Sequence, residues 1–156
     1  MDLRSKIRWS LFLLALVSVA SVMTAPRESG QAHKALLTGA RIDSHTRELL
    51  ERSCGDCHSE ATRYPWYSFV VPISWWIQRD VAQGRLHLDL SNWDQYSLVR
   101  KQRSLSEIAN QVKDREMPLH EYLWLHPSAK LSPSDVDSIF VWTQVERARL
   151  IAESQR

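Results

Sequence analysis

The sequence shows no pattern typical of β-structure and no sign of repetition. No stretch alternates apolar and polar residues with a period of two, and there are no internal repeats or low-complexity tracts. Half-buried strands require such alternation, whereas several stretches here carry apolar residues at helical spacing. The sequence therefore predicts an all-α fold, and its 156 residues suit one domain of ordinary size.

The sequence also lacks a dense cluster of positive charge. Its 20 Lys and Arg residues outnumber its 18 Asp and Glu residues by two. The excess lies in residues 1–20, which hold three of the basic residues and one of the acidic ones, so 17 of each remain elsewhere. Because no basic patch is available to bind a phosphate backbone, we expect no nucleic-acid partner.

Cysteine is scarce, and both cysteines fall in one short motif. Cys54 and Cys57 are the only two in the chain, and His58 follows directly. This C-x-x-C-H pattern is typical of covalent c-type haem attachment. Two intervening residues let the chain turn so that both thiols reach neighbouring vinyl groups, and the adjacent imidazole can bind the iron. The motif predicts one covalently attached haem c, held by Cys54, Cys57 and His58.

Other uses of the cysteine pair find less support. A thioredoxin-like redox dithiol belongs near a βαβ pattern, and none is visible. A structural zinc site needs four Cys or His ligands, usually in two spaced pairs, and the sequence has no second C-x-x-C and no H-x-x-x-H. A disulfide between Cys54 and Cys57, in a non-haem redox or structural module, stays as an alternative.

Methionine, a candidate for the second axial ligand of the haem iron, is also scarce. Of the three methionines, Met1 and Met23 lie in or beside the N-terminal leader, which leaves Met117 alone in the remainder. Met117 precedes a proline at the end of a predicted helix, where a loop could present its sulfur to iron. Filling a gap in the core is the plainer use of this side chain. We predict that Met117 and His58 are the two iron ligands.

Three histidines offer alternatives to Met117 as the second ligand. They are His87, His120 and His126. An iron with no second protein ligand is the remaining possibility. The difference decides function, because Met/His ligation raises the reduction potential and closes the iron to substrates, whereas an open position admits peroxide, oxygen or other small ligands.

The chain begins with a basic segment followed by an apolar one. Arg4, Lys6 and Arg8 precede the uncharged stretch 9–25. This is signal-peptide architecture, and Ser18-Val19-Ala20 offers small residues for cleavage. The stretch is also just long enough to act as an uncleaved membrane anchor. Both readings put the rest of the chain outside the cytoplasmic membrane, in the periplasm, where bacteria attach haem c.

The chain is predicted to have three parts. Residues 1–25 form the signal peptide or membrane anchor, and residues 26–42, which are polar with scattered Gly and Pro, form a tether. Residues 43–150 form the haem-binding domain. Its predicted helices span residues 44–53, 73–83 with Gly84 as the stop, 104–115 with a capping box from Ser104 to Glu107, and 133 onward after the N-cap Ser132.

Aromatic and basic residues are expected to surround the cofactor. The chain has seven tryptophans, and a haem has a large apolar surface that aromatic side chains cover well. Arginines can pair with the haem propionates through bidentate hydrogen bonds, although a solvated surface position is the plainer reading. The expected core tryptophans are Trp75, Trp76, Trp93, Trp124 and Trp142, and the arginines are Arg63, Arg79 and Arg85.

Taken together, these segments resemble the bacterial monohaem "haem-binding domain" family of c-type cytochrome-like proteins. The resemblance covers about residues 45–145 and is carried by the motif 54–59, the aromatic loop Tyr64-Pro65-Trp66-Tyr67-Ser68 and the pair Met117-Pro118. It implies a periplasmic or membrane-anchored haem c domain in which Cys54 and Cys57 are attached and His58 is the proximal ligand. The arrangement is more loosely similar to a class I cytochrome c, which implies a small helical domain around the haem.

The leading hypothesis is a monohaem c-type cytochrome that transfers one electron at a time, with periplasmic or membrane redox proteins as partners. No catalytic residue is identified, so an electron carrier is expected rather than an enzyme. The first alternative is an open-site haem enzyme or a peroxide or gas sensor. The second is the non-haem C-x-x-C module.

Overall fold

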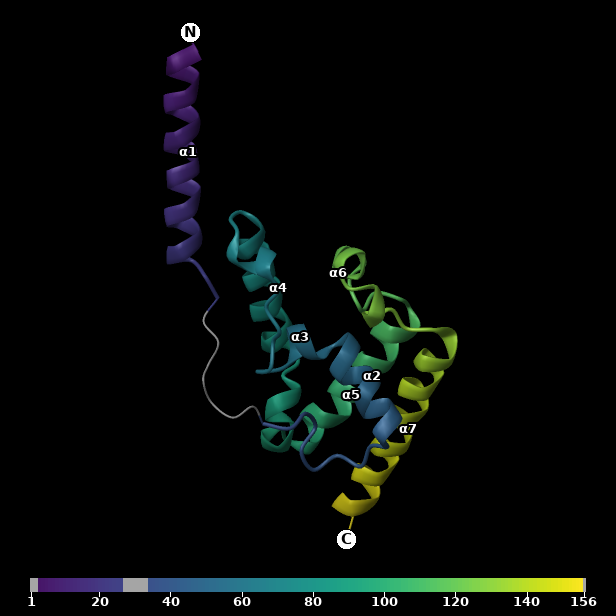
Figure 1. Ribbon diagram of the computed structural model, residues 1–156. Coiled ribbons are helices and arrows are strands. Elements are labelled where there is room, and N and C mark those ends of the chain that lie inside the picture. Colours follow the sequence, from purple (N-terminus) through teal and green to yellow (C-terminus); the bar gives the residue numbers. More distant parts are fainter. Residues whose placement is uncertain (1–2, 27–33, 156) are drawn as a thin grey trace.

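The computed structural model describes residues 3–26 and 34–155, and every regular element in this part of the chain is helical (Figure 1). The predicted all-α fold is confirmed. In chain order the elements are α1 (Leu3–Met23), α2 (Ser44–Ser53), α3 (Gly55–His58), the 3-10 turn η1 (Trp66–Phe69), α4 (Ile73–His87), η2 (Leu90–Gln95), α5 (Leu98–Lys113), α6 (His120–Leu125), η3 (Pro127–Ala129) and α7 (Pro133–Ser154).

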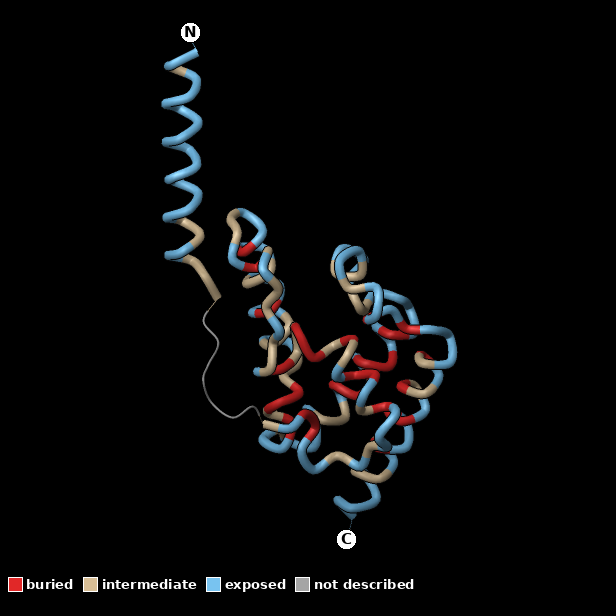
Figure 2. The backbone as a smooth tube through the Cα atoms, viewed as in Figure 1, coloured by how far each residue is buried: buried red, intermediate tan, exposed pale blue. Residues whose placement is uncertain are grey.

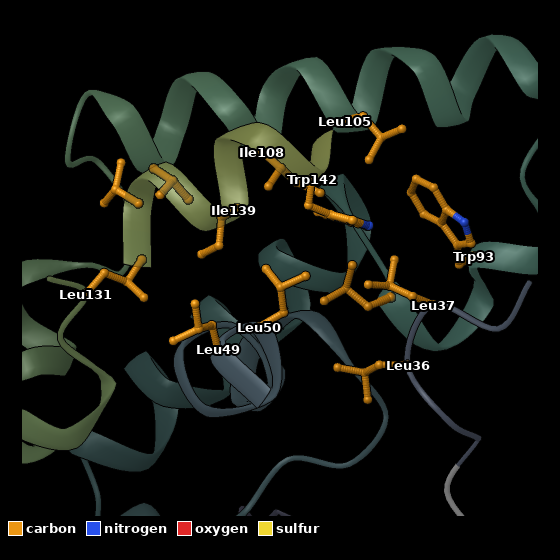
Figure 3. Close-up of a cluster of buried hydrophobic side chains, with 13 residues drawn as sticks. Leu36, Leu37, Leu49, Leu50, Trp93, Leu105, Ile108, Leu131, Ile139 and Trp142 are labelled. Carbon is orange, nitrogen blue, oxygen red and sulfur yellow. The ribbon is translucent and has the colours of Figure 1, made fainter. Parts of the chain in front are cut away.

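The apolar core lies between α2, α5 and α7. Helices α5 and α7 pack along each other, and Figure 3 shows Leu49 and Leu50 of α2 facing Ile108 of α5 and Ile139 of α7. All four side chains are buried. Burial of one such side chain contributes about 1.5–3 kcal/mol relative to exposure, so this cluster supplies much of the stability of the fold.

The segment predicted as a tether belongs in part to this core. Residues 27–33 lie outside the described part of the chain, but Leu36 and Leu37 are buried in the core cluster. The Leu37 N–H donates to the Leu90 carbonyl oxygen at 2.9 Å, and Trp142 Nε1 donates to the Arg41 carbonyl oxygen at 3.0 Å. The packed unit therefore begins before the predicted boundary at residue 43, because these residues share the core and hydrogen bonds with the helical part.

Helix α5 begins earlier than its sequence signature suggests. It starts at Leu98, after Ser97, whose Oγ accepts a hydrogen bond from the Arg100 N–H. The predicted N-cap Ser104 is instead buried inside the helix. A capping box stabilises a helix end only where the preceding residues leave the helix, and residues 98–103 do not. The predicted starts of α2 and α7 are confirmed, with Asp43 and Ser132 as N-caps.

Helix α4 passes through Gly84, the predicted stop, and ends at His87. Only Ser74 and Val81 of this helix are buried. The prediction that its tryptophans lie in the core is wrong, since Trp75 and Trp76 are 53% and 64% exposed.

Of the three other tryptophans predicted to lie in the core, one is exposed and two are buried. Trp124 is 79% exposed, whereas Trp93 and Trp142 are buried as predicted. Burial depends on which face of a short helix meets the core, and an aromatic residue type alone does not determine that face.

Most of helix α1 projects away from the packed helices, and its C-terminal end lies beside the start of α4 (Figures 1 and 2). None of its residues is buried. Among the described residues it is the one helix long and apolar enough to cross a membrane, with 21 residues and a mean hydropathy of 1.6. A signal sequence near the N-terminus has the same properties. The N-terminal apolar helix therefore fits either a signal sequence or a membrane anchor.

Candidate functional site

Helix α2 leads the chain directly into the cysteine motif. Asp43 Oδ1 accepts the Thr46 N–H at 2.9 Å and so begins α2, and α3 follows after Cys54. The N–H groups of Cys57 and His58 both donate to the Cys54 carbonyl oxygen, at 3.2 and 2.9 Å. Residues three positions apart share one face of a helical turn, so this turn brings the two cysteines to the same side.

All four predicted cofactor ligands line one cavity of about 910 Å³. Cys57 and His58 approach it from α3, Cys54 from the position just before α3, and Met117 from the loop between α5 and α6. The volume lies within the range of about 300–1,000 Å³ that is usual for small-molecule and cofactor sites. The apolar side chains of its walls include Leu50, Leu88, Leu90, Ile108 and Val112.

The imidazole of His58 is oriented by a backbone carbonyl group. Nδ1 of His58 lies 2.9 Å from the carbonyl oxygen of Leu88, at the end of α4. A carbonyl oxygen can only accept, so Nδ1 carries the proton and donates it. In the neutral form of the ring, Nε2 is then the nitrogen with the free lone pair, as a metal-ligating histidine requires. No signal in the sequence identifies Leu88, because the group involved belongs to the main chain.

Gly84 explains how α4 comes close enough to the motif for this contact. A Cβ atom at Gly84 would lie 2.6 Å from the Cys57 carbonyl oxygen and 3.1 Å from its carbonyl carbon. Only glycine leaves room for the backbones of α3 and α4 at this distance. The residue predicted to stop α4 instead lets the helix pack against Cys57, and Leu88 follows one turn later.

The thiols of Cys54 and Cys57 form no disulfide and have raised pKa values. Cys54 and Cys57 are both free, so the structure has no disulfide between them. Burial raises the pKa of Cys54 to about 12 and that of Cys57 to about 11. A redox dithiol uses a thiolate with a lowered pKa, so the raised pKa values do not favour that use. Among the described residues, no group of three or more His, Cys, Asp or Glu side chains is arranged to bind a metal ion.

Met117 is positioned by the way α5 ends. Arg115 adopts a left-handed conformation with φ of 61°. The N–H groups of Arg115 and Glu116 donate back to the carbonyl oxygens of Val112 and Gln111, at 3.3 and 3.0 Å. This pattern is a Schellman motif, which turns the chain sharply after a helix. It directs the next residue, Met117, to the cavity.

The three alternative histidines are not equivalent. His87 lines the cavity, whereas His120 and His126 do not. His126 is engaged elsewhere, since its ring stacks on Tyr122 with centroids 4.0 Å apart and its Nε2 lies 3.0 Å from the hydroxyl of Tyr67. His87 directly precedes Leu88, which holds His58, so the backbone keeps it near the His58 end of the cavity.

Asp56, inside the cysteine motif, connects the two sides of the cavity. The Tyr122 hydroxyl, from α6, donates to Asp56 Oδ2 at 2.7 Å. Arg63 Nε donates to Asp56 Oδ1 at 3.1 Å. Burial and the hydrogen bond to Asp56 raise the pKa of Tyr122 well above its ordinary value. Neither Asp56 nor Tyr122 belongs to a recognisable motif pair, because 66 residues separate them.

The arginines expected near the cofactor are mostly engaged elsewhere. Arg63 binds Asp56, and Arg85 Nε donates to the Ser59 carbonyl oxygen at 2.8 Å. Neither of them lines the cavity, and Arg79 does not line it either. The arginines that line the cavity are Arg100 and Arg103 of α5. They also have partners, since Arg103 Nε donates to Glu107 Oε1 at 2.7 Å and the Arg100 guanidinium lies 4.0 Å from the Tyr96 ring centroid.

The residues of this cavity fit a haem. The donor set consists of two neutral thiols on one helical turn, an imidazole with a free Nε2 and a thioether on the facing loop. The walls are largely apolar, as a porphyrin requires, and the lining includes two arginines, a residue type that pairs with carboxylates such as the haem propionates.

Comparison with known sequences points the same way. The chain matches the protein family described as the haem-binding domain over residues 12–145. The match runs from the middle of α1 into α7 and includes every residue of the site. No curated protein and no solved structure matches the chain.

Proposed function

The chain belongs to the haem-binding domain family, and on that premise we propose that it is a c-type cytochrome that carries one covalent haem c and transfers single electrons. Cys54 and Cys57 would form the thioether bonds, and His58 and Met117 would bind the iron. The observation that carries the proposal is that these four side chains meet in one largely apolar cavity. Bound there, the haem supplies an iron atom that exchanges one electron between its ferric and ferrous states.

The chain's own residues would prepare this site for electron transfer. The Leu88 carbonyl oxygen holds the proton of His58 at Nδ1 and leaves Nε2 for the iron. Leucine, isoleucine and valine side chains line the cavity and would exclude water from the faces of a bound haem. A thioether ligand from Met117 would raise the reduction potential and leave no open coordination position, which suits outer-sphere transfer to another protein rather than catalysis.

The proposed location is the outer side of the cytoplasmic membrane. The N-terminal helix carries Arg4, Lys6 and Arg8 at its start and no charged residue from Trp9 to Met23. Basic residues stay on the cytoplasmic side of a first membrane helix, so the following domain would lie outside. The proposed electron partners are therefore periplasmic or membrane redox proteins.

The first test is the covalent attachment itself. The protein is produced in cells able to mature c-type cytochromes, and its mass and haem staining on a denaturing gel are measured. We expect the mass of the polypeptide plus one haem, and stain that survives denaturation, because thioether bonds are covalent. A Cys54→Ser/Cys57→Ser variant is expected to lose the stain. A processed wild-type protein with the mass of the bare polypeptide would overturn the proposal.

The second test concerns Met117. The oxidised wild-type protein is expected to be low-spin and to show the weak far-red absorption band typical of Met–iron(III) ligation. Met117→Ala should abolish this band and lower the reduction potential, whereas His87→Ala, the matched control in the same cavity, should keep both. A high-spin wild-type spectrum with fast cyanide or peroxide binding would instead favour the open-site enzyme or sensor.

A further inference from the structure

An unusually aromatic surface lies at the start of α4. We define the α4 tip as residues 66–76, which comprise η1 and the first turn of α4. Trp66, Trp75 and Trp76 are 78%, 53% and 64% exposed, and Phe69 and Ile73 are exposed beside them. Proteins in water rarely gather several large apolar side chains on one surface unless it meets a partner or a membrane. None of these residues lines the haem cavity, so the proposed cofactor does not explain them.

The C-terminal end of α1 lies against this tip. The Val71 N–H donates to Ser21 Oγ at 3.3 Å, and Gln78 Nε2 donates to the Thr24 carbonyl oxygen at 2.6 Å. Figure 1 shows the first part of α4 beside the last turns of α1. The tip is therefore held at the point where the apolar N-terminal helix ends.

The contact between α1 and the α4 tip would place the tip at the surface of a bilayer that α1 spans. Helix α1 has 21 residues and is about 30 Å long, so it can cross the hydrocarbon core of a membrane when its basic side chains at the N-terminal end extend to the headgroups. Its basic residues are at the N-terminal end, which puts the C-terminal end at the outer surface. Tryptophan is the side chain most enriched at such surfaces, because its ring is apolar and its N–H can still meet water.

We propose that the α4 tip is seated in the outer interfacial layer of the phospholipid bilayer that α1 spans, through Trp66, Trp75 and Trp76. The proposal rests on the retention of α1 as an anchor. The membrane would then hold the domain in one orientation instead of at the end of a loose leader. Because α4 has 15 residues, it would carry the His58 side of the cavity about 20 Å along the helix from the tip.

The test uses the full-length, haem-loaded protein in vesicles of phosphatidylethanolamine and phosphatidylglycerol that contain a phospholipid with a photoreactive acyl chain. After illumination, the labelled peptides are identified by mass spectrometry. We expect labels on α1 and on the peptide 64–78, with the latter labelled at least about tenfold more than the C-terminal peptide. That peptide is the internal control, because it contains exposed Ile151 and lies at the opposite end of the molecule (Figure 1).

Three other outcomes would overturn the proposal. Labelling of α1 without labelling of 64–78 would mean that the tip stays in water or meets a protein. Absence of α1 from the mature protein would remove the anchor on which the proposal rests. A Trp66→Gln/Trp75→Gln/Trp76→Gln variant that is labelled at 64–78 as strongly as the wild type would rule out the aromatic contact. Haem staining of the same samples reports separately on the proposed function, since these exposed residues are outside the cavity.

Discussion

The two sides of the cavity are built in different ways. The His58 side depends on close backbone packing, where Gly84 of α4 touches Cys57 and the Leu88 carbonyl oxygen holds the imidazole. The Met117 side is a loop set by the end of α5 and tied to the motif by the hydrogen bond between Tyr122 and Asp56. Backbone contacts of this kind leave no room for adjustment, whereas a loop held by side chains can shift. The proposed histidine ligand thus lies on the rigid side, and the proposed methionine ligand lies on the adjustable side.

The largest effect is expected from a methyl group added to the rigid side. Gly84→Ala should lower the free energy of unfolding by about 3 kcal/mol, because the new Cβ would meet the Cys57 backbone. Without that contact, Ala would stabilise the interior of a helix by about 1 kcal/mol. Chemical denaturation followed by circular dichroism measures the difference.

Gly55→Ala is the matched control for this prediction. A Cβ at Gly55 would meet its nearest neighbour, Leu36 Cδ2, at an ordinary 3.9 Å. Its effect is expected to stay below about 1 kcal/mol. Equal losses in the two variants would show that the close approach of α3 and α4 is not what distinguishes the His58 side.

The next largest loss of stability is expected when the hydrogen bond between Tyr122 and Asp56, which joins the two sides of the cavity, is removed. Tyr122→Phe removes the hydroxyl that donates to the buried Asp56 carboxylate but keeps the ring that stacks on His126. Loss of a hydrogen bond to a charged group should cost about 2 kcal/mol. The far-red band of Met–iron ligation should weaken at the same time, because the Met117 loop is released.

Tyr67→Phe is the control for the loss of the hydrogen bond between Tyr122 and Asp56. It removes the hydrogen bond to the His126 ring instead, so a loss of about 1 kcal/mol or less and an unchanged band are expected. A stronger effect on the band from Tyr67→Phe than from Tyr122→Phe would contradict a role for Asp56 in joining the two sides.

A third prediction concerns how stability at alkaline pH depends on the hydrogen bond between Tyr122 and Asp56. The pKa of Tyr122 is raised in the folded state by burial and Asp56, so the folded chain keeps a proton that the unfolded chain releases above about pH 10. Stability is therefore fully present below pH 10 and falls as the pH rises. For one proton the slope is at most about 1.4 kcal/mol per pH unit, and partial exposure of Tyr122 reduces it.

Urea unfolding between pH 8 and 11 measures this slope. Tyr122→Phe should show a shallower alkaline decline than the wild type, since phenylalanine has no proton to release. Parallel declines in both proteins would mean that Tyr122 does not differ between the folded and unfolded states.

The smallest effect is expected at the end of α5. Arg115 holds a left-handed conformation that favours glycine, and its Nη1 donates to the Leu131 carbonyl oxygen at 2.8 Å. Arg115→Gly should relieve about 1 kcal/mol of strain and lose a hydrogen bond of similar size, so the net change is close to zero. Arg115→Ala loses the bond and keeps the strain, so it should be about 1 kcal/mol less stable than Arg115→Gly. Denaturant midpoints of the two variants would separate these terms.

The sequence by itself determined the helical class, the starts of α2 and α7, and the candidate ligands. These properties are local, since a cap, a periodic stripe and a C-x-x-C-H motif each depend on residues a few positions apart. Elimination among the three methionines then left Met117 as the predicted second ligand, with three histidines and an open site as alternatives.

Only the tertiary structure decided how these local pieces meet. It brought Met117 into the same cavity as Cys54 and His58, made Gly84 a point of contact instead of a helix end, and turned Trp75 and Trp76 outward. Such outcomes depend on partners far away in the sequence and on which face of each helix is buried. Residue type and spacing constrain that choice weakly, because the free energy that decides it comes from packing between helices.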